Sequence, residues 1–252
     1  MIITKKMLGE RITSFRKMKG LSQEELAFSI DLSRSALAKI EMGQRTVSAL
    51  ELNDIGNVLG FSLNEILAVD FEGSTDGTEQ LPKEIDTTPY PSKLRAVLLY
   101  VLERCAGKSN VGETVLYKML YFSDFDYYEL YQKYLTGMKY RKLSYGPVPL
   151  RIEHFINSMI QRNDLRRIKC RYQSYLQTRY VPLQSPDRTL LGSAEKEVID
   201  KVIDQFSDMS AAAISVWSHH DQPWLLSKNG EVIDYRLALL RQAPYSVVRS
   251  AL

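Results

Sequence analysis

The sequence predicts a mainly α-helical protein of two domains: a small five-helix domain, then a larger α+β domain with a small antiparallel sheet. Apolar residues recur at steps of three and four along most of the chain, as they do on helices with one buried face. One stretch in the second half alternates apolar with basic residues instead, which is typical of a half-buried strand. Composition changes near the middle of the chain, since all fifteen tyrosines lie at Tyr90 or later.

A segment rich in Gly, Thr, Pro and acidic residues separates the two domains. Residues 70–91 have no apolar periodicity, so we expect an acidic flexible linker there. The first domain then covers residues 1–69 and the second covers residues 92–252. A length of 252 residues agrees with two domains at roughly 150 residues each.

Five apolar stripes define the helices of the first domain. They are Leu8, Ile12 and Phe15; Leu26, Ala27 and Ile30; Leu37 and Ile40; Leu52, Ile55 and Leu59; and Leu63, Ile66 and Leu67. Three helix starts carry a Ser with a Glu three residues later: Ser22/Glu25, Ser48/Glu51 and Ser62/Glu65. In such a pair the serine oxygen accepts from a backbone N–H, and the glutamate accepts from the serine N–H.

The second domain is predicted to be helical with a few strands. Helical spacing covers residues 94–102, 152–160 and 198–206. Strands are expected at residues 138–144 and 167–172, with a partner for the second of these around residues 176–183.

The segment Leu21–Arg45, LSQEELAFSIDLSRSALAKIEMGQR, predicts two short helices joined by a tight turn. Over residues 8–68, QEELA, LSRSALAKIEMG and the two capped helices that follow resemble the Cro and phage-repressor type of helix-turn-helix domain. The resemblance implies that the third helix enters the major groove of double-stranded DNA. A helix ~10–12 Å across fits a groove ~12 Å wide, and its first residues meet base edges.

One face of the third helix is expected to meet DNA, because Leu37 and Ile40 must face the core. The residues expected at DNA are Arg34, Ser35 and Lys39 for base edges, and Gln23, Ser33 and Arg45 for phosphates. Arg34 and Lys39 can donate to guanine O6 and N7. Backbone N–H groups at the starts of the second and third helices also favour a phosphate.

Three further expectations concern this domain. Arg16 and Glu41 match a pair that bridges the first and third helices in similar domains, so we assign them a structural role. Asp31 stands in the turn where similar sequences usually have Gly; Asp tolerates a positive φ better than most residues, so the turn is expected to persist with some strain. The family also implies a homodimer on two half-sites about 34 Å apart.

The chain has a net charge of +3, but charged residues are unevenly distributed along it. Residues 1–69 carry nine Lys or Arg against eight Asp or Glu, residues 70–88 carry one against six, and residues 89–252 carry 23 against 16. A DNA-reading domain with so little net charge depends on placed side chains more than on its overall field.

The segment LYKMLYFSDF, followed some twenty residues later by LSYGPVP, resembles the Panacea, or SocA-like antitoxin, domain. The element SHHDQPW, Ser218–Trp224, adds weaker support, and the resemblance runs from about Ser92 to Gln242. It implies an antitoxin that binds and neutralises a toxin encoded beside it. We expect Pro147 and Pro149 to prevent regular strand pairing and to favour a stiff turn before a helix.

Two groups of residues are candidates for binding that cognate toxin. Tyrosine is enriched at protein interfaces, and basic side chains on one face of a strand suit an acidic partner. The candidates are Tyr127, Tyr128 and Tyr131, and Arg167, Lys169 and Arg171. The alternatives are that the tyrosines belong to the core with hydroxyls at its rim, and that the basic residues form a solvated face or meet nucleic acid.

No enzymatic motif is present. His219, His220 and Asp221 suggest a metal site or a catalytic base, but adjacent residues of a helix point apart, so we expect neither. We expect no catalysis, no metal and no cofactor. No apolar run approaches the ~18 residues that span a bilayer, and the first residues lack a signal-peptide core, so a cytoplasmic protein without membrane contact is expected.

The sequence therefore predicts an antitoxin of a type II toxin–antitoxin system that masks a neighbouring toxin and represses its own operon. Two alternatives remain open: a phage-type transcriptional regulator whose second domain senses or dimerises, and a proteolytic adaptor that delivers the toxin to a protease.

Overall fold

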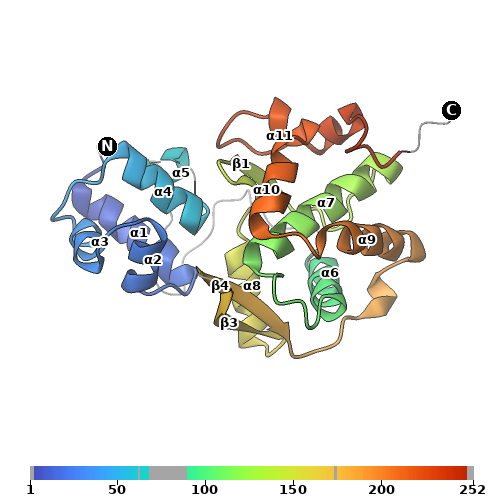
Figure 1. The fold of residues 1–252 in the computed structure, drawn as a ribbon, viewed down its shortest axis with the longest axis horizontal. Helices are drawn as coiled ribbons and strands as arrows, with labels where there is room; N and C mark the ends of the chain where they lie inside the picture. Colours follow the sequence, from blue (N-terminus) through green and yellow to red (C-terminus); the bar gives the residue numbers. More distant parts are fainter. Residues whose placement is uncertain (1–2, 62, 68–89, 173–174, 249–252) are drawn as a thin grey trace. The chain divides into compact units, whose positions relative to one another are not determined.

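The computed structural model describes residues 3–61, 63–67, 90–172 and 175–248. The chain divides into two compact units, Met1–Ile85 and Asp86–Leu252 (Figure 1). The predicted linker, residues 70–91, lies outside the described residues except at its last two positions. No helix in the described ranges combines the length and apolarity that crossing a membrane requires.

The first unit has the five predicted helices. They are α1 (Lys5–Met18), α2 (Gln23–Ser29), α3 (Arg34–Glu41), α4 (Ala49–Leu59) and α5 (Leu63–Leu67). Each predicted stripe contributes to one core, whose fully buried members include Ile12, Leu26, Leu37 and Ile55. The helical spacing therefore predicted both the helices and the faces that they bury.

Two of the three predicted helix caps are confirmed. The backbone N–H of Glu25 donates to Ser22 Oγ (3.2 Å), and the N–H of Ser22 donates to Glu25 Oε2 (2.7 Å). Ser48 and Glu51 make the same pair of bonds at 3.2 and 2.9 Å. The third pair, Ser62 and Glu65, falls on side chains outside the described part of the chain.

The turn between α2 and α3 has the predicted left-handed residue. Asp31 has φ +53°, a conformation that L residues other than Asn and Asp seldom adopt. The backbone N–H of Leu32 donates to Ala27 O at 2.9 Å, which closes the turn. Asp31 thus occupies a place where glycine would carry no strain.

The second unit is helical with two separate hairpins. Its α-helices are α6 (Pro91–Arg104), α7 (Glu113–Tyr131), α8 (Ile152–Gln161), α9 (Ser193–Phe206), α10 (Ala211–His219) and α11 (Gln222–Leu226). Two 3₁₀ turns are η1 (Arg188–Leu190) and η2 (Tyr235–Leu240). The strands are β1 (Tyr140–Leu143), β2 (Gly146–Pro149), β3 (Leu165–Tyr172) and β4 (Tyr175–Pro182). The predicted small sheet is in fact two antiparallel pairs, β1–β2 and β3–β4.

Helix α7 is the central element of this unit. Every residue from Val115 to Asp126 is buried, so α7 must be surrounded on all sides. It packs against α9, α10, β2 and η2. Phe125 stacks on Tyr235 with ring centroids 4.4 Å apart. Any polar side chain on such a helix needs a partner inside the protein.

The expectation that Pro147 and Pro149 prevent strand pairing is wrong. Both prolines lie in β2, opposite Lys142 and Tyr140 of β1. The backbone groups of these two β1 residues bond instead to the segment after α11: Lys142 N donates to Glu231 O (3.0 Å), and Ile233 N donates to Tyr140 O (2.8 Å). The prolines therefore occupy positions at which the β1–β2 ladder needs no N–H donor.

A side chain at Gly146 would displace its neighbours, and this generates a test. It has φ +97°, and a Cβ there would lie 2.4 Å from Ser218 Oγ and 2.8 Å from Lys118 Nζ. Gly107 has a similar φ of +88°, but a Cβ there would meet nothing within 4 Å. We expect Gly107→Ala to lower the free energy of unfolding by about 1–2 kcal/mol through backbone strain. Gly146→Ala should lower it by about 1–3 kcal/mol more, because the extra methyl overpacks the site.

Urea unfolding of the two variants measures the difference directly. Equal losses of stability at the two glycines would contradict the close approach of α7 and α10 to β2.

Candidate functional site

The outer face of α3 presents the three residues predicted to read bases. Arg34, Ser35 and Lys39 are exposed, whereas Leu37 and Ile40 are buried on the opposite side. Ser33 caps the helix, and its Oγ accepts from Ala36 N at 3.2 Å. The start of α3 thus leaves its first turn open to solvent, as a helix that enters a groove requires.

A buried ion pair fixes the position of α3. Arg16 of α1 donates to Glu41 of α3 through Nε (2.6 Å) and Nη2 (2.9 Å), and through Nη1 to Leu21 O (2.8 Å). The predicted structural pair is therefore present, in two-pronged geometry. Removing one partner of a buried pair costs about 3–5 kcal/mol, because the other charge is left without compensation.

Gln23 has a second contact that the sequence did not predict. Its Nε2 donates to Glu41 Oε2 at 2.9 Å, so the carboxylate that anchors α3 also orients the first side chain of α2. Burial alone would raise the pKa of Glu41, but the hydrogen bonds from Arg16 and Gln23 bring it below its usual value. An amide nitrogen carries two hydrogens, so Gln23 keeps one donor for a phosphate.

Arg45 is already engaged with an acidic residue. Its Nη2 donates to Glu51 Oε1 at 2.6 Å, and the arginine is half-buried. A hydrogen bond from the backbone N–H of Ser48 lowers the pKa of Glu51, and the hydrogen bond from Arg45 contributes a smaller lowering. A phosphate contact by Arg45 remains a prediction, and it would have to share the guanidinium with Glu51.

The segments that carry the Panacea resemblance meet inside the second unit. Lys118 of α7 donates through Nζ to Pro147 O at 2.7 Å. Gly146 lies against both Lys118 and Ser218, one residue from each of the other two segments. Burial lowers the pKa of Lys118 to about 7. These residues are therefore used to join α7, β2 and α10, and they are not on the surface.

Asp124, also in LYKMLYFSDF, joins α7 to the chain before β1. It accepts from Thr136 N (2.8 Å), Thr136 Oγ1 (2.6 Å) and Tyr140 Oη (2.6 Å). Burial raises the pKa of Asp124 to about 6, while the hydrogen bonds from Thr136 and Tyr140 oppose that shift. These bonds connect the middle of α7 to Tyr140, the first residue of β1.

The two histidines of SHHDQPW do not come together around a ligand. The ring of His219 stacks on Trp224 with centroids 4.4 Å apart, and His220 is exposed with Nδ1 2.9 Å from Val216 O. Burial is the main cause that lowers the pKa of His219. Within the residues that the structure describes, no three His, Cys, Asp or Glu side chains are placed to hold a metal.

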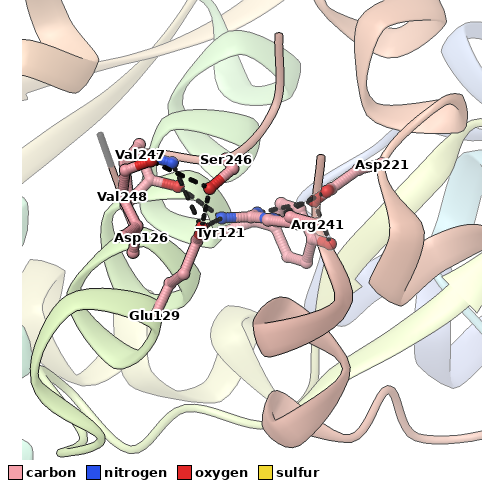
Figure 2. A network of polar contacts seen from close by, with 8 residues as sticks. All are labelled: Tyr121, Asp126, Glu129, Asp221, Arg241, Ser246, Val247 and Val248. Atoms are coloured by element: carbon pink, nitrogen blue, oxygen red, sulfur yellow. Dashed lines mark hydrogen bonds and ion pairs between the residues drawn. The ribbon is translucent and has the colours of Figure 1, made fainter. Parts of the chain in front are cut away.

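Arg241 forms a buried polar centre that sequence reasoning missed (Figure 2). Its guanidinium donates to both oxygens of Asp221 (2.7 and 2.6 Å), to Asp126 (2.7 Å) and to Glu129 (3.1 Å). Tyr121 donates to Asp221 at 2.7 Å. A signal was present in the sequence: Asp126 and Glu129 lie three residues apart on a helix rich in apolar and aromatic residues, and buried carboxylates there require a cation.

The chain after η2 is attached to the same centre. Ser246 Oγ donates to Glu129 Oε1 at 2.5 Å, and Val247 N donates to that oxygen at 3.2 Å (Figure 2). Three carboxylates thus share one guanidinium. Burial raises the pKa of Asp126 to about 7, although Arg241 opposes this shift.

The six candidate toxin-binding residues lie in two places. Tyr127 and Tyr128 are half-buried, and Tyr131 is exposed at the end of α7. Lys169 and Arg171 are exposed on β3, but Arg167 is largely enclosed and donates to Glu153 Oε2 at 2.7 Å.

The α7 tyrosines and the β3 cations are far apart. Arg167 pairs with Tyr180 across the hairpin, and Tyr180 Oη lies 3.3 Å from Tyr117 Oη. Tyr131 follows Tyr117 by fourteen residues along α7, which is about 21 Å at 1.5 Å per residue. A single small contact surface does not include both groups.

Two family models match the chain. Residues 12–66 match a helix-turn-helix family, and residues 116–225 match the antitoxin SocA-like, Panacea domain. The fold and the exposed face of α3 define a DNA-binding regulator. The chain belongs to the helix-turn-helix family through its first unit, and its second unit carries an antitoxin SocA-like Panacea domain.

Curated relatives match the first unit. An uncharacterized HTH-type transcriptional regulator, YazB, of Bacillus subtilis (strain 168) is 43% identical over 58 residues, which are 23% of this chain and 84% of that protein. Control protein C.MunI of Mycoplasma sp is 41% identical over 61 residues, 24% of this chain and 82% of its own. Control protein C.BamHI of Bacillus amyloliquefaciens is 36% identical over 62 residues, which are 24% of this chain and 76% of that protein. No solved structure matches the chain.

The face of α3 generates a second test. Arg34→Ala and Lys39→Ala should each weaken binding to the cognate operator by about 1–3 kcal/mol, because each removes a donor to a base edge. Lys17→Ala is the matched control, since Lys17 is an exposed cation on α1. Fluorescence anisotropy at one salt concentration, with duplexes from the region upstream of the gene, measures the effect. Unchanged affinity in a folded double variant would show that α3 does not read the operator.

The Arg241 centre generates a pH prediction. The folded-state pKa of Asp126 is about 7, against about 3.9 for an unfolded chain. Between these values the folded state holds a proton that the unfolded state has lost, so the contribution of Asp126 to the free energy of unfolding falls as pH rises from about 4 to about 7. Asp126→Asn cannot titrate, so it should lose less stability than the wild type over that range.

Urea unfolding at several pH values tests the sign of this difference. Asp204→Asn, at an exposed carboxylate of α9, serves as the control and should follow the wild-type profile. If Asp126→Asn instead loses stability relative to the wild type as pH rises from 4 to 7, the carboxylate is ionised throughout.

Proposed function

We propose that this protein is an antitoxin of a type II toxin–antitoxin pair, which masks a neighbouring toxin by direct binding and represses its own operon. One observation carries the proposal. A helix-turn-helix unit with an exposed recognition face and an antitoxin SocA-like domain are joined in one chain. Neither unit alone implies both activities.

The DNA-binding arm of the proposal depends on α3. Its outer face carries Arg34 and Lys39, and the Arg16–Glu41 pair holds the helix in place. One module makes few base contacts, so we propose a homodimer on two half-sites of double-stranded DNA. Two of the relatives are named control proteins and one a transcriptional regulator, which supports a regulatory role for this unit.

The toxin-binding arm depends on the surface of the second unit. Lys118, Gly146 and Ser218 are buried where three segments meet, so the segments that carry the family resemblance build the fold. We therefore propose that exposed side chains of this unit, rather than these segments, contact the partner. We propose neutralisation by steric masking, without catalysis or a cofactor.

Growth of a host that expresses the neighbouring reading frame tests the proposal. Expression of that frame alone should arrest growth, and co-expression of this protein should restore it. The Arg34→Ala/Lys39→Ala double variant should still restore growth, because it leaves the second unit intact, but it should no longer repress a reporter driven by the operon promoter.

The outcomes separate the alternatives. Repression without rescue by stable, soluble protein would favour a regulator whose second unit only senses or dimerises. Rescue accompanied by loss of the toxin, with the toxin persisting in a protease-deficient host, would favour a proteolytic adaptor. Loss of rescue in the double variant would contradict the division of labour between the units.

A further inference from the structure

Large apolar side chains are exposed together over four neighbouring segments of the second unit. They are Tyr131, Tyr134, Leu225, Leu226, Leu239 and Leu240, each 43–55% exposed. We refer to these six residues as the apolar face. Single exposed apolar residues are ordinary, whereas a group of them on adjoining elements marks an interaction site.

The segments of the apolar face are in contact with one another. Helix α7 and α11 both pack against η2. The ring of Tyr134 lies 5.0 Å from that of Tyr235, the first residue of η2. In Figure 1, α11 lies well away from the β3–β4 hairpin.

The Arg241 centre makes this face rigid. It joins Asp126 and Glu129 of α7, Asp221 at the start of α11 and the chain that follows η2 (Figure 2). These are the same elements that carry the apolar face. A surface held in one conformation before binding loses less conformational entropy when a partner docks.

Charge around the apolar face favours an acidic partner. Two acidic side chains of the segment between α11 and η2 are paired, Asp234 with Arg236 at 2.5 Å and Glu231 with Lys228 at 3.9 Å. Lys133 is exposed between the two tyrosines of the face.

Lys142 adds positive charge beside α11. It lies 3.9 Å above the ring of Trp224 and donates to Ser227 O at 3.0 Å. Neither contact supplies a negative charge, so neither neutralises the ammonium.

We infer that the toxin docks on the apolar face through an apolar segment that carries acidic side chains. This inference rests on the proposed function and names its contact surface. Of the candidates predicted from the sequence, Tyr131 belongs to the face and Tyr127 and Tyr128 pack beneath it, in contact with Tyr131 and Tyr134. The β3 residues Arg167, Lys169 and Arg171 are not part of it.

Paired substitutions in the full-length chain test the inference. Leu226→Glu/Leu240→Glu alters the face, and Leu183→Glu/Leu190→Glu is the matched control, because those leucines are 42% and 39% exposed outside it. The probe is the co-expressed product of the neighbouring reading frame, and the readout is its Kd by calorimetry. The face variant should raise Kd about 100-fold or more, whereas the control should change it less than about threefold.

A third variant tests the charge of the partner. Leu226→Lys/Leu240→Lys removes the same apolar contacts but adds positive charge, so its Kd should be about tenfold lower than that of the Glu variant. Equal Kd values for the Lys and Glu variants would overturn the acidic character of the partner. Retained operator binding and an unchanged thermal melt confirm that each variant is folded.

The failures are distinguishable. If the wild type neither binds nor neutralises the neighbouring product, the proposed function fails, and this inference fails with it. If the wild type binds and the face variant binds equally well, only the apolar face is wrong. If the face variant instead converts a dimer to a monomer and leaves the toxin Kd unchanged, the face is occupied by a second copy of this chain.

Discussion

The guanidinium of Arg241 is fully enclosed, and it binds two carboxylates of α7 and the carboxylate of Asp221, the residue before α11. A buried charge is tolerated only when opposite charges and hydrogen bonds surround it. The positions of α7, α11 and the segment after η2 are therefore coupled: none can move without leaving a charge unpaired in the interior. The exposed surface of these elements depends on that one buried cation.

The first unit also has a buried arginine that is paired with a carboxylate, here a single one. Arg16 and Glu41 join α1 to α3, and Glu41 also holds Gln23 at the start of α2. One carboxylate thus sets the orientation of the recognition helix and of a neighbouring side chain expected at a phosphate. In both units a buried arginine–carboxylate contact positions a surface without taking part in it, which separates the residues that hold the fold from those available for recognition.

The segments of strongest family resemblance lie inside the second unit. Gly146 makes room for Lys118 and Ser218, and the two prolines of β2 occupy ladder positions that need no donor. Such contacts depend on close approach and tolerate few residue types. Surface positions such as Leu240 and Tyr131 are free of that constraint. The interior contacts of this unit therefore constrain the family segments more tightly than they constrain its exposed side chains.

Patterns between residues close together in the sequence were sufficient to predict much of the secondary structure of this protein. Helical spacing and Ser/Glu pairs determined the five helices of the first unit, and the side of α3 that faces solvent followed from Leu37 and Ile40. The strand pairing of Pro147 was mispredicted. Whether a strand position needs a backbone N–H donor depends on the residue opposite it in the neighbouring strand, and the sequence does not show which residue that is. The Arg241 centre, the contact of Gln23 with Glu41 and the pairing of Arg167 with Glu153 were also decided by tertiary structure. They join residues from 14 to 115 positions apart, and charge partners at such separations leave no periodic signal in the sequence.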